Sequence, residues 1–237
     1  MALPFFYIPE FNPSQKEIVL DEDTSRHIVQ VLRMKQEEKV NLTNGKGNLI
    51  TAEITDPHKK HCTIKVIDSR PTSHVIRKIT IAISLLKNTN RFEWFLEKAT
   101  EIGVSEIVPL ICERTEKQKF RYDRMKGICI SAMLQSQQTW LPVLAEPVKY
   151  LEYIERIKKN IGLKNFIAYC DDTNNKQHLS AIKPLNDSTI LIGPEGDFTK
   201  QEIETALQNN FIPVSLGDTR LRTETAGVAA AVILTIA

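Results

Sequence analysis

Cysteine is scarce in this chain of 237 residues, and its four cysteines lie far apart without a C-x-x-C pair. That spacing disfavours a disulfide framework and is typical of reduced thiols in a cytosolic protein. An excess of charge of one sign is also absent, because 31 Lys and Arg are balanced by 29 Asp and Glu, giving a net charge of +2. Any surface that binds nucleic acid must therefore be a local patch.

Several common catalytic motifs are missing. The chain has no GxxxxGK[ST] P-loop and no GxGxxG fingerprint, so nucleotide hydrolysis and nicotinamide chemistry have no support in the sequence. His58, His61 and Cys62 share one lysine-rich turn without a fourth ligand, and we therefore expect no metal site. The pair Phe92 and Phe95 is expected in a hydrophobic core rather than beside a cofactor.

Long hydrophobic runs are missing too. Residues 226–237 are apolar, yet a membrane-spanning helix needs about 20 such residues. They predict a buried helix, which a partner chain could cover, and no membrane association. The first ten residues contain two prolines and no basic segment, so we do not expect a signal peptide. A cytoplasmic location is the resulting expectation.

The N-terminal part of the chain predicts a small β-barrel. Four β-favouring runs alternate with turn signals, among them Asn44-Gly45, which is typical of a hairpin. Apolar residues at helical spacing predict a short helix at 24–33, which exposes Arg26 and Arg33. The predicted strands cover residues 18–20, 39–42, 49–54 and 62–67.

From Lys78 onward the pattern changes to alternating strands and helices. Residues 79–86 form a near-continuous apolar run, as in a strand buried on both faces. A helix is predicted at 91–102, ended by Gly103, and the next strand at 104–111. This alternation predicts an α/β fold class with a parallel sheet. The predicted domain limits are 1–70 for the barrel, 71–77 for a linker and 78–237 for the α/β domain.

Two glycine turns follow two short strands near the end of the chain. The strand at 189–192 runs into Gly193-Pro194-Glu195-Gly196, and the strand at 212–216 runs into Gly217. Thr199 and Glu202 have the spacing of a capping box, which predicts a helix after the first turn. Ligands in open α/β sheets bind outside the carboxyl ends of strands, so we expect a binding site here.

The residues of the first turn suit the approach of a ligand. Gly193 and Gly196 are expected to take positive φ and to let a flat ligand reach the backbone, while Pro194 stiffens the loop. An ordinary strand-to-helix turn is the alternative explanation of this motif.

Residues 113–126 are strongly basic, with six Lys or Arg against three acids. Phe120 and Tyr122 lie among them. Such a segment could hold a phosphate backbone and stack a base, or it could be a solvated charged loop.

An ordered set of motifs spans nearly the whole chain. In sequence order they are Phe5-Phe6-Tyr7, His27-Ile28, Val31-Leu32-Arg33, Lys87, Arg91-Phe92-Glu93-Trp94, Glu97 to Val104, Pro109-Leu110, Glu113-Arg114, Gln135-Ser136, Leu141-Pro142, Gly193 to Gly196, Leu216-Gly217 and Leu221 to Ala226. Together they resemble the RsmE family, the bacterial small-subunit rRNA uridine-N3 methyltransferases of the SPOUT superfamily.

The resemblance implies a PUA-like N-terminal barrel for RNA and a C-terminal α/β domain with a deep trefoil knot. It implies S-adenosylmethionine as cofactor and 16S rRNA of the small ribosomal subunit as substrate, with uridine 1498 as the expected target. It also implies a homodimer in which the site lies beside the interface. The implied cofactor-binding residues are Ile192, Gly193, Pro194, Glu195, Gly196, Leu216, Gly217, Leu221, Arg222 and Thr223. The implied RNA-binding residues are Arg26, Arg33, Lys87, Arg91 and Arg114.

Three residues are candidates for the chemistry that this resemblance implies. Glu224 is the expected acceptor of the uridine N3 proton, with Glu195 as the second candidate. Arg222 could stabilise charge on the uracil oxygens or hold a phosphate. The alternative role for Glu224 is structural, as a cap of the last helix or an ion-pair partner of Arg222.

The chain departs from the family pattern at three places. Asp197 follows Gly196 where the family has a second glycine, and Leu134 and Gln138 stand where it has a Glu and an Arg. Asp218-Thr219-Arg220 also moves an arginine by one position. Two other functions stay open: a SPOUT enzyme that methylates a ribose 2′-hydroxyl, and a non-catalytic RNA-binding or ribosome-assembly protein.

Overall fold

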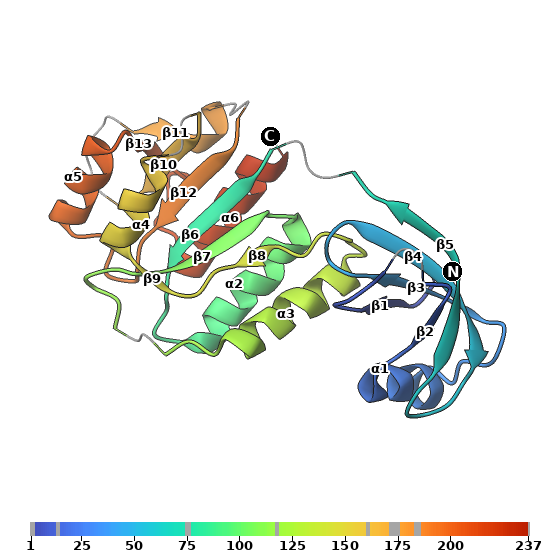
Figure 1. The fold of residues 1–237 in the computed structure, drawn as a ribbon. Helices are drawn as coiled ribbons and strands as arrows, with labels where there is room; N and C mark the ends of the chain where they lie inside the picture. The colour runs from blue at the N-terminus through green and yellow to red at the C-terminus, as the bar shows by residue number, and fades with distance from the viewer. Residues whose placement is uncertain are drawn as a thin grey trace. The chain divides into compact units, whose positions relative to one another are not determined.

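The chain divides into two compact units (Figure 1). The first comprises Met1–His74 with Met133–Leu141, and the second comprises Val75–Ala132 with Pro142–Ala237. Part of the predicted linker at 71–77 lies outside the described residues. The computed structural model describes residues 3–12, 15–73, 77–116, 119–159, 162–170, 176–182 and 186–236.

A five-stranded mixed sheet forms the first unit, in the order β1-β3-β4-β5-β2. β1 runs parallel to β3, and the other neighbours are antiparallel. The four predicted strands are confirmed, and the structure adds β1, a three-residue strand that was not predicted. The bounds are β1 (Phe5–Tyr7), β2 (Glu17–Val19), β3 (Lys39–Thr43), β4 (Asn48–Asp56) and β5 (Thr63–Pro71).

Side chains that alternate along these strands build the core of the first unit. Val40 and Leu42 of β3 pair with Ala52 and Ile50 of β4, and all four are fully buried. The residues between them are more exposed, as the two-residue period of a strand requires. Ile28, from the helical segment after β2, is also fully buried.

The predicted helix at 24–33 is confirmed in place but differs at both ends. α1 spans Glu22–Arg26, and a π-helical turn, η1, continues it over His27–Val31. The helix begins earlier than predicted because Asp21 is its N-cap: the carboxylate accepts a hydrogen bond from the Thr24 backbone N–H at 2.9 Å. Arg33 follows the helical segment with a left-handed φ of 55°.

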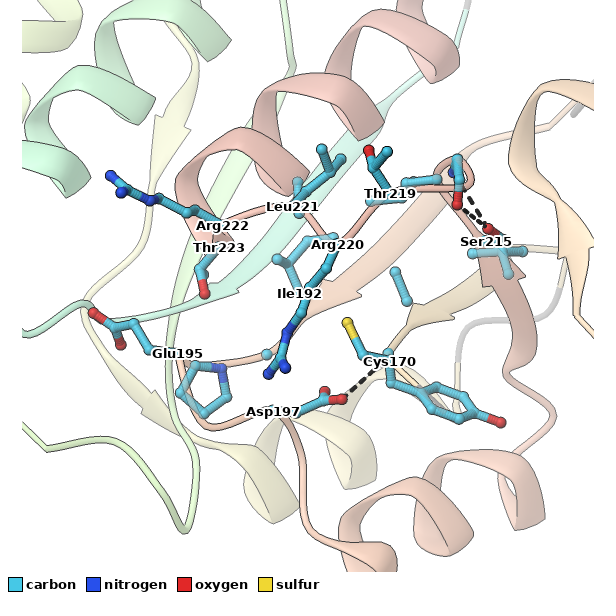
Figure 2. A pocket seen from close by; sticks show the side chains of 18 of the residues that line it. Cys170, Ile192, Glu195, Asp197, Ser215, Thr219, Arg220, Leu221, Arg222 and Thr223 are labelled. Atoms are coloured by element: carbon cyan, nitrogen blue, oxygen red, sulfur yellow. Dashed lines mark hydrogen bonds between the residues drawn. The ribbon is translucent and has the colours of Figure 1, made fainter. Parts of the chain in front are cut away.

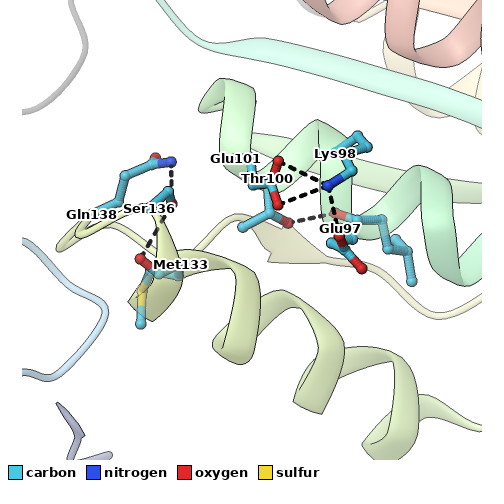
Figure 3. Close-up of polar contacts among 8 residues, drawn as sticks. Glu97, Lys98, Thr100, Glu101, Met133, Ser136 and Gln138 are labelled. Atoms are coloured by element: carbon cyan, nitrogen blue, oxygen red, sulfur yellow. Dashed lines mark hydrogen bonds and ion pairs between the residues drawn. The ribbon is translucent and has the colours of Figure 1, made fainter. Parts of the chain in front are cut away.

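A segment from the middle of the chain completes the first unit. The Thr139 carbonyl accepts a hydrogen bond from the Gly47 N–H at 2.9 Å, and the Trp140 ring lies on Gly47. Gly45 and Gly47 both have positive φ, so the predicted hairpin turn at Asn44-Gly45 is confirmed between β3 and β4. Just before Thr139 in the same segment, the Gln138 amide donates to the Ser136 hydroxyl at 2.9 Å (Figure 3).

An eight-stranded sheet, parallel in all its pairings, organises the second unit. The order is β11-β13-β10-β12-β6-β7-β8, with β9 also paired to β7. Every residue of β6 is buried, as predicted from its apolar run, and every residue of β12 is buried too. The bounds are β6 (Ile79–Ser84), β7 (Glu106–Ile111), β8 (Val143–Leu144), β9 (Val148–Lys149), β10 (Lys164–Ala168), β11 (Gln177–His178), β12 (Ser188–Ile192) and β13 (Ile212–Ser215).

Helices cover both faces of this sheet (Figure 1). Ala82 of β6 faces the cluster built by α4 and α5, whereas Ile83, the next residue, faces Gly227 of α6 and Phe95 of α2. Phe92 and Phe95 are core residues, as predicted. The helices are α2 (Thr89–Ile102), α3 (Tyr122–Gln135), α4 (Tyr150–Ile157), η2 (Leu179–Ala181, a 3-10 turn), α5 (Lys200–Gln208) and α6 (Thr223–Ile236).

Local signals fixed several helix ends as expected. Gly103 ends α2 in the left-handed conformation, with φ 92°. Thr199 and Glu202 form the predicted capping box of α5. The basic segment 113–126 is only partly a loop, because α3 begins at Tyr122. Residues 117 and 118 of that segment lie outside the described residues.

Partly buried charges on α2 are neutralised by neighbours. The Lys98 ammonium group donates to Glu97 at 2.7 Å and to Glu101 at 3.0 Å (Figure 3). The Glu93 carboxylate receives two hydrogen bonds from the guanidinium of Arg124 on α3, at 2.5 and 2.8 Å. The second pair joins two helices, so its charge state affects their packing.

The Glu93–Arg124 pair predicts a pH-dependent stability. Hydrogen bonding to Arg124 lowers the pKa of Glu93 below its ordinary value of 4.5. A carboxyl whose pKa is lower in the folded state stabilises the fold above its unfolded-state pKa, and this contribution is lost as pH falls through the folded-state pKa. We expect Glu93→Gln to lower the melting temperature at pH 7 and to lessen the fall of melting temperature between pH 5 and pH 3. A parallel fall in the two proteins would contradict this.

All four cysteines are free, which agrees with the predicted reduced thiols. Burial raises the pKa of Cys62 to about 11 and that of Cys112 to about 12. No helix in the described part of the chain has both the length and the apolar character to cross a bilayer.

Candidate active site

A cavity of about 1010 Å³ lies at the carboxyl ends of three neighbouring strands of the second unit, β13, β10 and β12. Because the strands are parallel, the loops that follow them meet at one edge of the sheet. The two predicted glycine turns supply two walls, and the end of β10 supplies a third. The residues that line the cavity from these walls include Ile192, Gly193, Pro194, Glu195, Asp197, Leu216, Gly217, Leu221, Arg222, Thr223 and Cys170.

The first wall is the Gly193 loop (residues 193–198), and its backbone differs from the prediction that Gly193 and Gly196 take positive φ. Neither Gly193 nor Gly196 has positive φ; Asp197 takes the left-handed conformation instead, with φ 62°. Gly193 is needed for close packing, since a Cβ there would lie 3.1 Å from the Phe198 ring and 3.2 Å from its backbone N. A Cβ at Gly196 would make only ordinary contact with Arg114.

Contacts from outside the cavity hold this loop in place. The Arg114 guanidinium donates to the Gly196 carbonyl at 2.6 Å. The buried Glu202 carboxylate accepts from the backbone N–H groups of Glu113 at 2.9 Å and Thr199 at 2.8 Å. Arg114, predicted to bind RNA, therefore supports the loop.

The second wall is the Gly217 loop (residues 216–222). Gly217 has φ 147°, where any side chain would be strained. The Ser215 hydroxyl donates to the Gly217 carbonyl at 2.9 Å and closes the turn. Leu216 and Leu221 are half-buried and give this wall an apolar surface that suits a flat ring.

The third wall, at the end of β10, was missed by sequence reasoning. The Cys170 N–H donates to the Asp197 carboxylate at 2.7 Å. The Lys176 ammonium group lies 3.9 Å from the centre of the Tyr169 ring and donates to the Tyr169 carbonyl at 2.7 Å. No motif marks this wall, because strand order alone brings it between the glycine turns.

The three predicted catalytic residues lie in different settings. Glu195 and Arg222 are exposed and line the cavity on the same side (Figure 2). Glu224 is buried and does not line the cavity, although Thr223 and Ala226 beside it do. Two of the three residues thus face the cavity, and the third lies behind its lining.

Glu224 has an unusual environment for a buried carboxylate. Its side chain is 8 % exposed, and its Oε1 lies 3.6 Å from Nε of Arg91, which lines the cavity. Oε2 has no hydrogen-bond partner in the described residues. An unsatisfied buried carboxylate oxygen is costly, and a catalytic role is one explanation of such an atom.

The remaining predicted RNA-binding residues lie in both units. In the second, the Lys87 ammonium group pairs with Glu116 at 2.7 Å, and the Lys87 N–H donates to Glu195 at 3.2 Å. In the first, Arg26 pairs with Glu22 on α1 at 2.9 Å, and Arg33 is exposed.

His58 and His61 stack their rings, with centroids 3.6 Å apart, next to the buried Cys62. The raised pKa of Cys62 makes its thiolate scarce at neutral pH. The described residues contain no group of three or more His, Cys, Asp or Glu that could hold a metal ion.

Family models match both units of the chain. The model of an RNA methyltransferase domain matches residues 73–235, and the model of an RNA methyltransferase PUA domain matches residues 20–67. The predicted fold class is therefore confirmed: a PUA-like N-terminal domain precedes an α/β methyltransferase domain with parallel strands.

Known proteins are similar over almost the whole chain. A probable rRNA-methyltransferase from Porphyromonas gingivalis is 38% identical, with a TM-score of 0.88 and coverage of 97% of this chain and 95% of that one. A ribosomal RNA small subunit methyltransferase E from Neisseria gonorrhoeae, solved with S-adenosyl methionine, is 30% identical, with a TM-score of 0.86 and the same coverage. The enzyme of that name from Rickettsia conorii is 27% identical over 230 residues, 94% of this chain and 91% of its own. The chain belongs to the ribosomal RNA small subunit methyltransferase E family.

Proposed function

We propose that this protein transfers the methyl group of S-adenosylmethionine to N3 of uridine 1498 in 16S rRNA. The observation that carries the proposal is the cavity at the carboxyl ends of β10, β12 and β13, with a buried, unsatisfied carboxylate beside it. The solved Neisseria relative, bound to S-adenosyl methionine, supports the choice of methyl donor.

The residues of the cavity fit this donor. Its volume of about 1010 Å³ is at the upper end of the range of roughly 300–1,000 Å³ typical of small-molecule sites. Ile192, Leu216 and Leu221 offer apolar contact to an adenine ring, and Gly217 lets the ligand approach the backbone. The cavity is also lined by residues of both charges, among them Asp197 and Arg220, which suit a ligand that carries both signs of charge.

The chemistry requires alignment and the removal of one proton. S-adenosylmethionine supplies an activated methyl group when bound, so the chain has to align N3 with that group and exclude water. The reaction forms the N3–CH₃ bond, breaks the S–CH₃ bond and releases the N3 proton. Glu224 Oε2 is the acceptor we propose for that proton, with Glu195 as the second candidate. Arg222, exposed at the cavity, stabilises charge on the uracil oxygens.

We also propose that the working form is a homodimer. Val232 and Ile236 on α6 are 38% and 74% exposed, and Trp94 on the neighbouring α2 is 43% exposed. Exposed large apolar side chains on two adjacent helices support a surface that a partner covers. We expect light scattering to give twice the chain mass of 27.0 kDa; a single-chain mass at micromolar concentration would oppose the dimer.

The decisive experiment supplies the purified protein with methyl-labelled S-adenosylmethionine and small subunits from a strain that lacks this gene. A methyl group on N3 blocks Watson–Crick pairing, so reverse transcription should stop at uridine 1498. Subunits in which this uridine is replaced by cytidine are the control. If the labelled methyl group were found on a ribose 2′-oxygen, the protein would be a ribose 2′-hydroxyl methyltransferase. If the protein did not bind S-adenosylmethionine, a non-catalytic RNA-binding or assembly protein would be favoured.

A further inference from the structure

Two oppositely charged residues face the same part of the cavity. Asp197 comes from the Gly193 loop, and Arg220 comes from the Gly217 loop, 23 positions later in the chain. Figure 2 shows the Arg220 side chain crossing the cavity, with its guanidinium toward Asp197 and Cys170. Both are positions where the chain departs from the pattern of its family, so the two departures meet at one place.

Asp197 is held rigidly. Its Oδ2 accepts from the Cys170 N–H at 2.7 Å, and its Oδ1 accepts from the Phe198 N–H at 2.8 Å. Its own N–H donates to the Pro194 carbonyl at 2.9 Å. Each oxygen of a carboxylate can accept two hydrogen bonds, and each Asp197 oxygen accepts one here, so the group can still receive a donor from the cavity.

Arg220 is exposed, and the described residues give its guanidinium neither an ion pair nor a hydrogen bond. Three other charged residues at the cavity have partners: Lys176 donates to the Tyr169 carbonyl, Arg91 pairs with Glu224, and Glu195 accepts from the backbone of Lys87. In the described residues the Arg222 guanidinium, like that of Arg220, has neither an ion pair nor a hydrogen bond, but it lies on the side of Glu195, away from Asp197 (Figure 2). A guanidinium directed into a cavity is suited to bind a carboxylate.

We propose that Asp197 and Arg220 form a binding subsite for the zwitterionic amino-acid end of the methyl donor. Asp197 receives the α-ammonium group, and Arg220 receives the α-carboxylate. A ribose would use Asp197 as a hydroxyl acceptor but would leave Arg220 without a negative partner, whereas an amino acid satisfies both charges. The inference rests on the proposed function, because it assumes that the cavity holds this donor.

The test compares two nucleosides that differ only at the amino-acid end. S-adenosylhomocysteine carries the ammonium and carboxylate groups, and 5′-methylthioadenosine lacks them. Calorimetric titration should show that Asp197→Asn and Arg220→Met each weaken S-adenosylhomocysteine binding about 10- to 100-fold, as expected for a lost charge-assisted hydrogen bond. Binding of 5′-methylthioadenosine should change less than about two-fold.

Further variants protect the test from a folding artefact. Asn and Gly both tolerate the left-handed conformation of Asp197, so Asp197→Gly, which restores the family residue, serves as a second variant. Glu204→Gln, on the exposed side of α5, is the matched control and should bind both ligands like the wild type. Melting temperatures verify that each variant is folded.

The outcomes separate this inference from the proposed function. An equal loss for both nucleosides would overturn the subsite and place Asp197 at the ribose, and unchanged binding of S-adenosylhomocysteine by both variants would overturn it too. If the wild-type protein bound neither nucleoside, the proposed function itself would fail.

Discussion

Replacing Glu224 by Gln is expected to slow methyl transfer about 100- to 10,000-fold, the usual contribution of a general base. The substitution keeps the shape of the side chain and removes its ability to accept the N3 proton. Glu224 does not line the cavity, so the dissociation constant for S-adenosylmethionine should change less than about two-fold. Single-turnover rates on small subunits and calorimetric titration measure the two quantities separately.

The dependence of the rate on pH distinguishes a proton acceptor from a structural residue. Without the base, transfer depends on uridine that has already lost its N3 proton, so the rate of the Glu224→Gln variant should keep rising toward alkaline pH. A residue that only holds Arg91 in place would lower the rate equally at every pH. An equal loss of cofactor affinity and rate would remove the assignment to Glu224.

Two matched substitutions serve as controls for this prediction. Glu195→Gln removes the exposed carboxylate at the same cavity, and a loss larger than that of Glu224→Gln would make Glu195 the base. Glu204→Gln makes the same chemical change on the exposed side of α5 and should leave the rate unaltered.

The regular elements were predictable because their signals are local. The apolar runs of β6 and β12, the capping box at Thr199 and the left-handed Gly103 all depend on residues within a few positions. The position of the cavity was also predictable, because the alternation of strands and helices indicates a parallel sheet, and parallel strands put their carboxyl ends at one edge.

The contacts that decide the site are not local, and sequence reasoning missed them. Glu224 pairs with Arg91, more than a hundred positions earlier, rather than with Arg222. Arg222 precedes α6, which begins at Thr223, and its side chain is exposed, whereas the Glu224 carboxylate is buried. Likewise, the positive φ expected for the glycines of the Gly193 loop belongs to Asp197, whose carboxylate bonds to Cys170.

In the first unit, too, contacts between distant parts of the chain were not predictable from the sequence. Nothing in the motif Leu141-Pro142, or in the residues before it, indicates that Met133–Leu141 packs with the N-terminal sheet. That packing joins residues far apart in the sequence, through backbone hydrogen bonds such as Leu141 N–H to the Gly45 carbonyl at 2.9 Å and through the fit of the Trp140 ring on Gly47. Gly47 and Trp140 therefore offer a direct test of how the segment is held.

Gly47→Ala is expected to destabilise the protein by about 3 kcal/mol, the sum of two costs. Residue 47 has φ 82°, where a Cβ costs about 1–2 kcal/mol. The new methyl group would also lie 2.2 Å from the Trp140 ring, and overpacking of this kind costs typically 1–3 kcal/mol. The ring must move, so the fluorescence of Trp140 should shift to the red as water reaches it.

Gly162→Ala is the matched control, because it separates the two costs. Gly162 has φ 93°, but no atom lies within 4 Å of its Cβ position. It should therefore lose only the conformational part, about 1–2 kcal/mol, with unchanged fluorescence. Urea unfolding of the two variants and the wild type measures the difference. Equal destabilisation by the two substitutions would mean that Trp140 yields without cost, and that the segment is held by its backbone hydrogen bonds rather than by the fit of the ring on Gly47.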